Sequence, residues 1–281
     1  MTGSTLGRLF LVTTLAGAAW IGGCAPARGP AAPGESGGAG DPGAAGAPLV
    51  VFAAASLRDP IEEAARRFEA AHPGLRVQVN FGSSTALRTQ VEQGARVDVF
   101  LSADEANPAA LVASGMAAGP PKLFAHTSLA IVVPTDDQAG IVTPVDLARS
   151  GVKLIAAGDG VPLTAYVGQV LDSLASQPGY PADVAARIEA NVVSREADAR
   201  AVLTKVELGE GDAAIVYTTD ARRSRLVRVI AIPDDANVVV SYAAVVLAAA
   251  PRPDVAARFL AWLTDPDGQA LLAEYGFEAG S

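Results

Sequence analysis

The chain has 281 residues, half of them apolar, and a formal net charge of −9 at pH 7. This length and composition suit a folded protein with a substantial core and room for two lobes, and they exclude a chain that is disordered throughout. The acidic charge argues against nucleic-acid binding, which needs clustered Lys and Arg.

The first 24 residues have the features of a targeting segment. Arg8 is the one positively charged side chain before the apolar stretch of residues 9–21. This stretch is shorter than a typical membrane-spanning helix. The stretch runs into Gly22-Gly23-Cys24, which resembles a bacterial lipobox. Cys24 is the only cysteine, so the chain forms no internal disulfide and no multi-cysteine metal site. We interpret residues 1–24 as a lipoprotein signal peptide with its lipid anchor on Cys24; the alternative is an ordinary signal peptide with an incidental cysteine.

Residues 25–48 are dominated by Gly, Ala and Pro and show no periodicity. Such a segment predicts a flexible tether that spans on the order of 25–30 Å. It would hold a folded domain near a membrane and leave it free to move.

The pattern of strand, serine-containing turn and helix then occurs twice. An apolar run at 49–55 predicts a buried strand, Ser56 lies at its end, and residues 61–71 follow with helical spacing. Residues 75–81 alternate as a strand, a turn contains Ser83 and Ser84, and a helix follows at 86–92. Two such units in one parallel sheet direct both helix N-termini to the same edge, where unpaired N–H groups and hydroxyls can bind an anion. The alternative is that each serine only caps its helix.

Strand and helix patterns continue to alternate to the end of the chain, which predicts an α/β fold. Further strands are predicted at 97–102, 129–133, 152–157, 213–217, 227–232 and 238–248, and helices at 109–114, 145–149, around 166–174, and at 198–207, 255–263 and 267–275.

Enzyme signatures are scarce. The sequence has no phosphate-binding GxxxxGK[ST] loop and no HExxH. It has no GxSxG elbow between a strand and a helix, since the one GxSxG match, at 34–38, falls in the segment of Gly, Ala and Pro. His72 and His126 are the only histidines, and neither has an evident partner as base or ligand. A secreted serine hydrolase using Ser56 or Ser84 would need such a base, so we rank it last.

Five short motifs occur in an order and spacing that resemble one family. They are FAAASL at 52–57, FGSS at 81–84, DVFLSAD at 98–104, GD and VP at 158–162, and IVY at 215–217. Together they resemble the periplasmic molybdate-binding proteins of ABC importers, the ModA family, over nearly all of residues 49–281. The resemblance implies a bilobed class II periplasmic-binding-protein fold, with two α/β lobes joined by two crossover strands. Lobe one would comprise residues 49–127 plus 239–281, and lobe two residues 128–238.

The same resemblance implies an oxyanion held between the lobes by neutral donors. Carried over by position, these donors belong to Ser56, Ser84, Leu163, Ala199 and Tyr217, with Leu163 and Ala199 acting through backbone N–H groups. The expected ligand is molybdate or tungstate, with another oxyanion such as sulfate as the alternative. We expect no cofactor, no cation site and no catalysis. The implied partners are the permease and ATPase subunits of an importer, and we expect a lipid-anchored, extracytoplasmic monomer.

Two departures from the family pattern affect the prediction. Leu163 stands where relatives often have a small residue, so we expect its side chain to alter one wall of the cleft. Tyr242 is followed by Ala243, where the family commonly has proline.

Overall fold

The computed structural model describes residues 46–280. The predicted signal peptide, Cys24 and most of the predicted tether lie outside this range. No helix between residues 46 and 280 combines the length and apolar character needed to cross a membrane.

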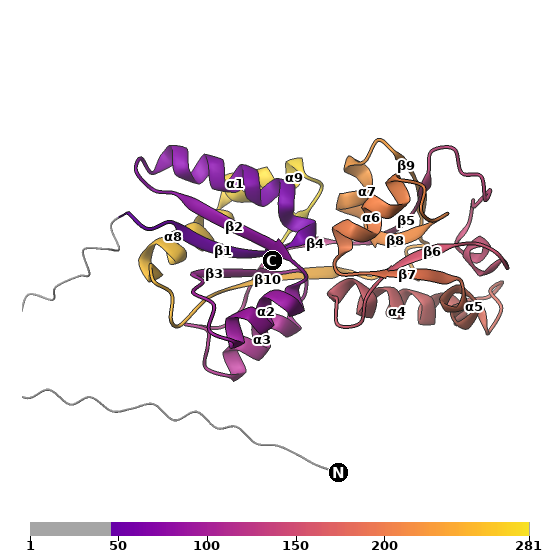
Figure 1. Ribbon diagram of the computed structural model, residues 1–281, viewed down its shortest axis with the longest axis horizontal. Coiled ribbons are helices and arrows are strands. Elements are labelled where there is room, and N and C mark those ends of the chain that lie inside the picture. Colours follow the sequence, from indigo (N-terminus) through magenta and orange to yellow (C-terminus); the bar gives the residue numbers. More distant parts are fainter. Residues whose placement is uncertain (1–45, 281) are drawn as a thin grey trace, which may run out of the picture. The chain divides into compact units, whose positions relative to one another are not determined.

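The first lobe is built on a six-stranded sheet in the order β11-β4-β10-β3-β1-β2 (Figure 1). Its strands are β1 (Leu49–Ala54), β2 (Val77–Gly82), β3 (Val99–Ser102), β4 (Lys122–Thr127), β10 (Val240–Val246) and β11 (Glu278–Ala279). β1 lies between β2 and β3, parallel to both, and five of its six residues are buried. β2 alternates between half-buried and exposed positions over most of its length, as expected at the edge of the sheet.

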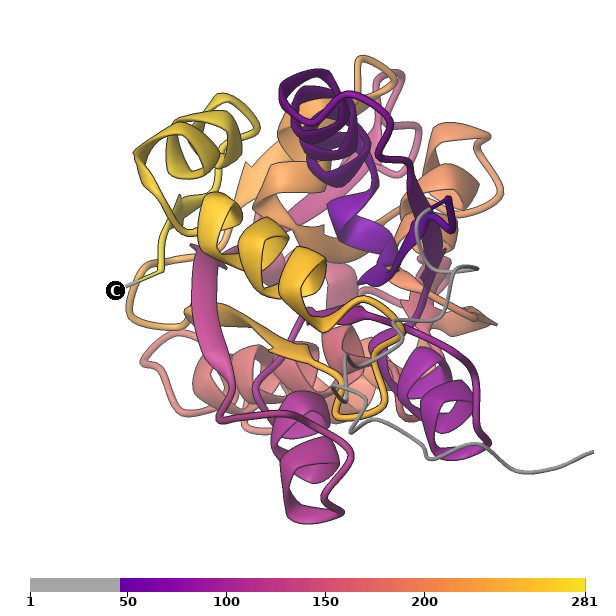
Figure 2. The same cartoon turned by 90° about the vertical axis from the view of Figure 1, so that its left-hand side faces the viewer.

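Helices cover both faces of this sheet. They are α1 (Arg58–Ala71), α2 (Ser84–Glu92), α3 (Ala106–Ala113), α8 (Pro253–Leu263) and α9 (Pro266–Glu274), with a short 3₁₀ turn, η1 (Ala55–Leu57), before α1. α1 and α9 lie on one side and α2 and α3 on the other (Figure 1). The view in Figure 2 shows α8 crossing in front of the sheet. Phe68 of α1 contacts Phe259 of α8 edge to face, which fixes these two helices to each other.

The second lobe contains β5 to β9. Its strands are β5 (Leu129–Pro134), β6 (Leu154–Ala157), β7 (Val192–Glu196), β8 (Ala214–Tyr217) and β9 (Val227–Ala231). A three-stranded sheet, β8-β5-β9, lies beside the β6-β7 pair, and a bridge between Leu154 and Ala213 joins them. The helical segments are η2 (Pro144–Ala148), α4 (Pro162–Ala175), α5 (Val184–Ala190), α6 (Ala199–Glu207) and α7 (Thr218–Arg223).

Two connections join the lobes. β4 passes into β5 through Ser128, and the chain returns from β9 into β10. The Asn237 side chain ties the two connections together, because its Oδ1 accepts from the Leu129 N–H at 3.1 Å and its Nδ2 donates to the Leu129 carbonyl at 2.8 Å.

The α/β prediction is confirmed, but antiparallel strands accompany the parallel ones: the six-stranded sheet is mixed, the β8-β5-β9 sheet is antiparallel and the β6-β7 pair is parallel. β10 is antiparallel to β3 and β4, and β5 is antiparallel to β8 and β9. The reason is topological: β4 leads out of the first lobe and β10 leads back into it, so these neighbours run in opposite directions. The strand and helix patterns also missed β4, α5, β7, α7 and β11.

Candidate anion-binding site

The two serine-containing turns lie at one edge of the first sheet. Ala54, the last residue of β1, pairs with Gly82, the last residue of β2. Ser56 therefore follows one strand and Ser84 the other at the same level of the sheet. Ser84 is the first residue of α2, where backbone N–H groups have no partner within the helix.

Both serines line a small cavity that is completed by the second lobe. Its volume is about 190 Å³ including its mouth. The first lobe contributes Ala54, Ala55, Ser56, Gly82, Ser83, Ser84 and Ala103, and the second lobe Val161, Pro162, Asp198, Ala199 and Tyr217. The structure thus brings together four of the five sequence-predicted residues, Leu163 being the exception.

Ser84 has the geometry of a donor, and its neighbour Ser83 does not. Ser84 is fully buried, and its Oγ accepts a hydrogen bond from the Ala103 N–H at 3.0 Å. The Ser84 hydroxyl proton therefore remains available to a group in the cavity. The Ser83 Oγ instead accepts from the Ala86 N–H at 3.2 Å, so Ser83 is the N-cap of α2.

Ser56 is also buried, and its Oγ lies 3.0 Å from the hydroxyl of Tyr242 on β10. Burial raises the pKa of Tyr242 well above its ordinary value, so its hydroxyl keeps its proton. The sequence analysis named Tyr242 only as the residue before Ala243, the position that departs from the family pattern. The available signal was that a tyrosine in a buried strand needs a hydrogen-bond partner.

The second lobe presents two helix N-termini to the cavity. Ala199 is the first residue of α6, and Asp198 caps this helix by accepting from the Ala201 N–H at 2.9 Å. Pro162 begins α4 and Leu163 follows it, so the Leu163 N–H belongs to the first turn, whose N–H groups lack intrahelical partners.

The expectation for the Leu163 side chain is wrong. This side chain is buried in the hydrophobic core, and Val161 and Pro162 form that wall of the cavity. The physical reason is that Leu163 is at the second position of α4, where its apolar side chain packs inward with those of Val170 and Leu171.

Tyr217 lies at the end of β8 and reaches the cavity from the second lobe. It is almost fully buried, and burial raises its pKa well above the ordinary value. Its ring contacts that of Tyr242 edge to face at 5.9 Å between centroids. Tyr217 is therefore a rigid, protonated phenol with its hydroxyl available as a donor.

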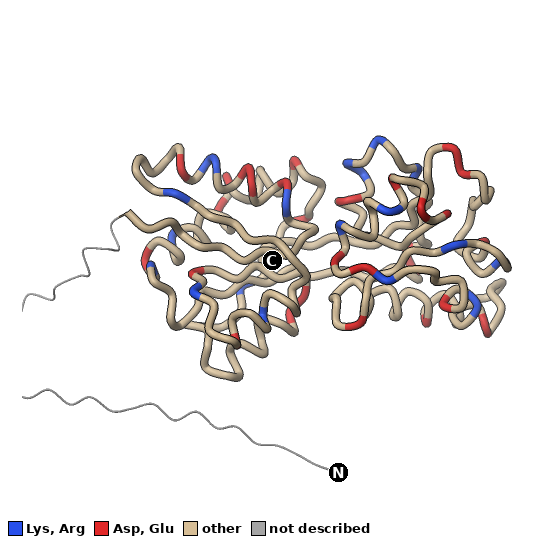
Figure 3. Tube along the Cα trace, viewed as in Figure 1, with Lys and Arg blue, Asp and Glu red and all other residues tan. Residues whose placement is uncertain are grey.

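The cavity's donors are neutral. Lys and Arg are interspersed with Asp and Glu along both lobes (Figure 3). Arg58, next in chain to the η1 turn, pairs with Glu62 at 3.4 Å and lies over the Phe81 ring, with 4.4 Å from its Cζ to the centroid. An anion in the cavity would therefore be held by hydroxyls, N–H groups and helix dipoles.

A second small cavity adjoins the first and also lies between the lobes. Ser56 lines both cavities, and this one contains Asp59 and Arg223, whose carboxylate and guanidinium groups are 3.0 Å apart. The Arg223 Cζ lies 4.3 Å from the centre of the Tyr275 ring. Asp59 and Tyr275 belong to the first lobe and Arg223 to α7 of the second lobe. These contacts therefore link the lobes.

Asp220 in the same cavity is buried and poorly paired. Its Oδ1 lies 3.7 Å from Arg200 Nη1, and its Oδ2 has no hydrogen-bond partner within the described part of the chain. Burial, the dominant cause, raises the pKa of this carboxyl from 3.8 to about 7.

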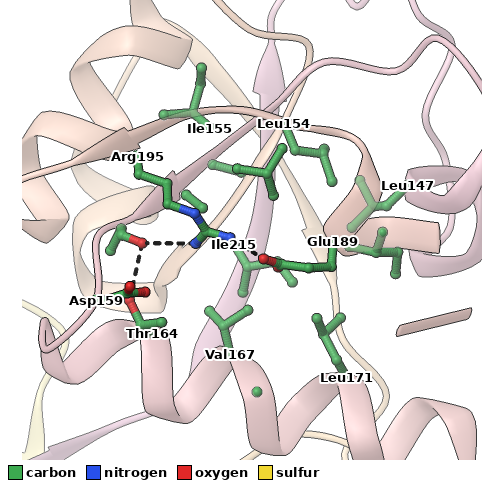
Figure 4. Close-up of a pocket in the computed structure, with 16 residues that line it drawn as sticks. Leu147, Leu154, Ile155, Asp159, Thr164, Val167, Leu171, Glu189, Arg195 and Ile215 are labelled. Carbon is green, nitrogen blue, oxygen red and sulfur yellow. Dashed lines mark hydrogen bonds and ion pairs between the residues drawn. The ribbon is translucent and has the colours of Figure 1, made fainter. Parts of the chain in front are cut away.

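A larger cavity of about 800 Å³, including its mouth, lies within the second lobe (Figure 4). β6, β7 and β8 line it on one side and α4 and α5 on the other, mostly with apolar side chains. Arg195 reaches into it but is already paired with Glu189 and lies 3.5 Å from the Ala157 carbonyl oxygen. The cavity between the lobes, and not this one, is therefore the candidate site for an anion.

The two-lobed α/β fold and the cavity between its lobes define the class of solute-binding proteins. The chain belongs to the family of bacterial extracellular solute-binding proteins, whose family model matches residues 49–278.

Individual proteins of known name are similar to this chain over most of its length. The molybdate-binding protein ModA of Mycobacterium tuberculosis is 34% identical over 230 residues, which cover 82% of this chain and 84% of the relative. A putative ABC transporter substrate-binding lipoprotein of Bacillus subtilis, YvgL, is 30% identical over 234 residues, with 82% and 86% covered. The periplasmic molybdate-binding protein structure from Azotobacter vinelandii matches with a TM-score of 0.70 at 23% identity, covering 83% of this chain and all of that one. The predicted class II binding-protein fold is confirmed.

Proposed function

We propose that this protein binds molybdate, and tungstate in its place, between its two lobes and delivers the oxyanion to the permease and ATPase subunits of an ABC importer. The proposal is supported most directly by the joint placement of Ser56, Ser84, Ala199 and Tyr217 around one cavity. It is also supported by the similarity to molybdate-binding proteins along most of the chain.

The chemistry of the cavity fits a fully deprotonated oxyanion. Such an anion offers only acceptors, and the cavity supplies hydroxyl donors together with helix N-termini. A hydrogen bond to a charged group contributes about 1.5–3 kcal/mol net of the bond to water that it replaces, so several such bonds together can bind a dianion out of water. A protonated phosphate would also need an acceptor. The one carboxylate that lines the cavity, Asp198, already accepts from the Ala201 N–H as the cap of α6, and the other polar groups around the cavity are donors.

The site implies closure of one lobe on the other. We assign residues 49–127 and 239–281 to lobe one and residues 128–238 to lobe two, with the two connections as the hinge. The Asp59–Arg223 ion pair then forms when the lobes close on the ligand.

Attachment to a membrane is proposed through a lipid on Cys24, which ends an apolar segment in the sequence. The protein would act as a tethered monomer. Cys24→Ser should move it from the detergent phase to the aqueous phase in detergent partitioning. An unchanged distribution would contradict the anchor.

Calorimetry tests the ligand. Molybdate, tungstate, sulfate and phosphate are titrated in turn into the purified protein. Tight one-to-one binding of molybdate and tungstate, with no heat from sulfate or phosphate, is the expected result. Binding of sulfate alone would make this a receptor for another oxyanion, and binding of none of the four would refute the proposal.

The hydrolase alternative has no support from the geometry. Within residues 46–280, neither histidine is hydrogen-bonded to Ser56 or Ser84; the His72 Nδ1 lies 2.8 Å from the Phe68 carbonyl oxygen. Esterase activity that disappears in Ser56→Ala would revive this alternative.

A further inference from the structure

The buried hydroxyl of Tyr242 lies beside the proposed ligand without lining its cavity. Tyr242 is fully buried, and the one hydrogen bond of its side chain within residues 46–280 joins it to Ser56. It lies at an irregularity of β10, soon after the chain re-enters the first lobe. The rings of Phe124, Tyr217 and Phe277 surround it at centroid distances of 6.1, 5.9 and 5.3 Å.

This packing fixes the position of the Tyr242 hydroxyl. The three neighbouring rings come from β4, from β8 and from the segment before β11, so elements of both lobes hold it in place. Aromatic pairs in edge-to-face contact resist reorientation, and the phenol oxygen is therefore held at 3.0 Å from the Ser56 Oγ.

The direction of the hydrogen bond follows from the ligand. The Ser56 hydroxyl has a single proton, and an oxyanion with no proton of its own can only accept it. Once Ser56 donates to the anion, its Oγ can only accept from Tyr242, so Tyr242 must be the donor. Burial keeps the phenol protonated, which supports this direction.

We propose that Tyr242 is a positioning residue for oxyanion binding, because its hydroxyl donates to the Ser56 Oγ and thereby points the Ser56 proton at the ligand. The inference rests on the proposed function. It adds a residue that acts through Ser56 and makes no contact with the anion itself. Hydrogen bonds in such a chain polarise one another, so the bond from Ser56 to the anion is strengthened as well as oriented.

A double-mutant cycle tests this proposal, with molybdate affinity measured by calorimetry for wild type, Tyr242→Phe, Ser56→Ala and the double variant. Phenylalanine keeps the aromatic packing and removes only the hydroxyl. In the wild-type background we expect Tyr242→Phe to weaken binding about three- to tenfold. In the Ser56→Ala background the same change should have less than about a twofold effect, because the residue through which Tyr242 acts is gone.

An equal loss in both backgrounds would show that the Tyr242 hydroxyl acts independently of Ser56, and no loss in the wild-type background would show that it has no role; either result overturns the inference. Tyr180→Phe, which removes a partly exposed hydroxyl in the second lobe, is the matched control and should leave affinity unchanged. If wild type fails to bind molybdate, the proposed function fails instead, so the two failures are distinguishable.

A second measurement does not depend on the variant folding. In wild-type protein saturated with molybdate, the Tyr242 hydroxyl proton should exchange slowly with water and show an NMR cross-peak to the Ser56 side chain. A rapidly exchanging hydroxyl proton, without that cross-peak, would contradict the inference.

Discussion

Ser84→Ala should affect both ligand affinity and stability. The variant removes one hydrogen bond to the charged ligand, worth about 1.5–3 kcal/mol, which corresponds to roughly a ten- to hundredfold loss of molybdate affinity. It also removes the acceptor of the buried Ala103 N–H, which now bonds to the Ser84 Oγ at 3.0 Å. Leaving a buried donor unpaired costs about 1–3 kcal/mol, so urea unfolding of the ligand-free protein should show a lower free energy of unfolding.

Ser83→Ala is the matched control, because it changes the adjacent residue in the same way. Ser83 caps α2 through the Ala86 N–H, so its loss should lower the free energy of unfolding by about 0.5–2 kcal/mol. Molybdate affinity should fall much less than in Ser84→Ala. The reasoning is refuted if Ser83→Ala loses more affinity than Ser84→Ala, or if both variants bind like wild type.

Three further substitutions test other features of the structure. Arg223→Ala removes an exposed ion pair between the lobes and should weaken molybdate binding about two- to fivefold, mainly because molybdate dissociates faster. Stopped-flow measurements give the dissociation rate, and an unchanged rate would contradict the role of Arg223 in closure. The pKa of Asp220 is raised to about 7, so the folded protein keeps a proton on this carboxyl that the unfolded chain releases near pH 4. The contribution of Asp220 to the free energy of unfolding therefore falls as the pH rises from about 4 to about 7. The free energy of unfolding of Asp220→Asn relative to wild type should therefore be higher at about pH 8 than at about pH 5, and a pH-independent difference would refute the shift. Gly168 lies within α4, and a Cβ at this position would meet no atom within 4 Å. Gly168→Ala should therefore raise the free energy of unfolding by about 1 kcal/mol and leave molybdate affinity unchanged. A lower free energy of unfolding would refute this prediction.

Local patterns predicted much of the fold. The apolar run of β1 and the alternation of β2 gave both strands, and the Asp265-Pro266 step marks the start of α9. The missed elements are short or polar. α7 has six residues without apolar periodicity, and β7 exposes a side chain at alternate positions but includes Ser, Arg and Glu among its five residues. Their structure depends on packing against neighbours, which a local pattern does not contain.

The candidate site was predictable only in part. Two serines that follow parallel strands indicated an anion-binding site, because the ends of parallel strands meet at one edge of the sheet. Contacts between distant parts of the chain were not predictable. Ser56 and Tyr242 are 186 residues apart, and Asp59 and Arg223 are 164 apart. The direction of the Leu163 side chain likewise follows from how α4 packs on its lobe.

The central claim is that neutral donors from both lobes hold the oxyanion, and a crystal structure with tungstate tests it most directly. Tungsten scatters anomalously, so its position can be found without assuming where the ligand binds. We predict one strong tungsten peak in this cavity, with the tungstate oxygens within hydrogen-bonding reach of the Ser56, Ser84 and Tyr217 hydroxyls and of the first N–H groups of α4 and α6. A peak beside Arg195 in the second lobe, or at any other arginine or lysine in place of this cavity, would contradict it.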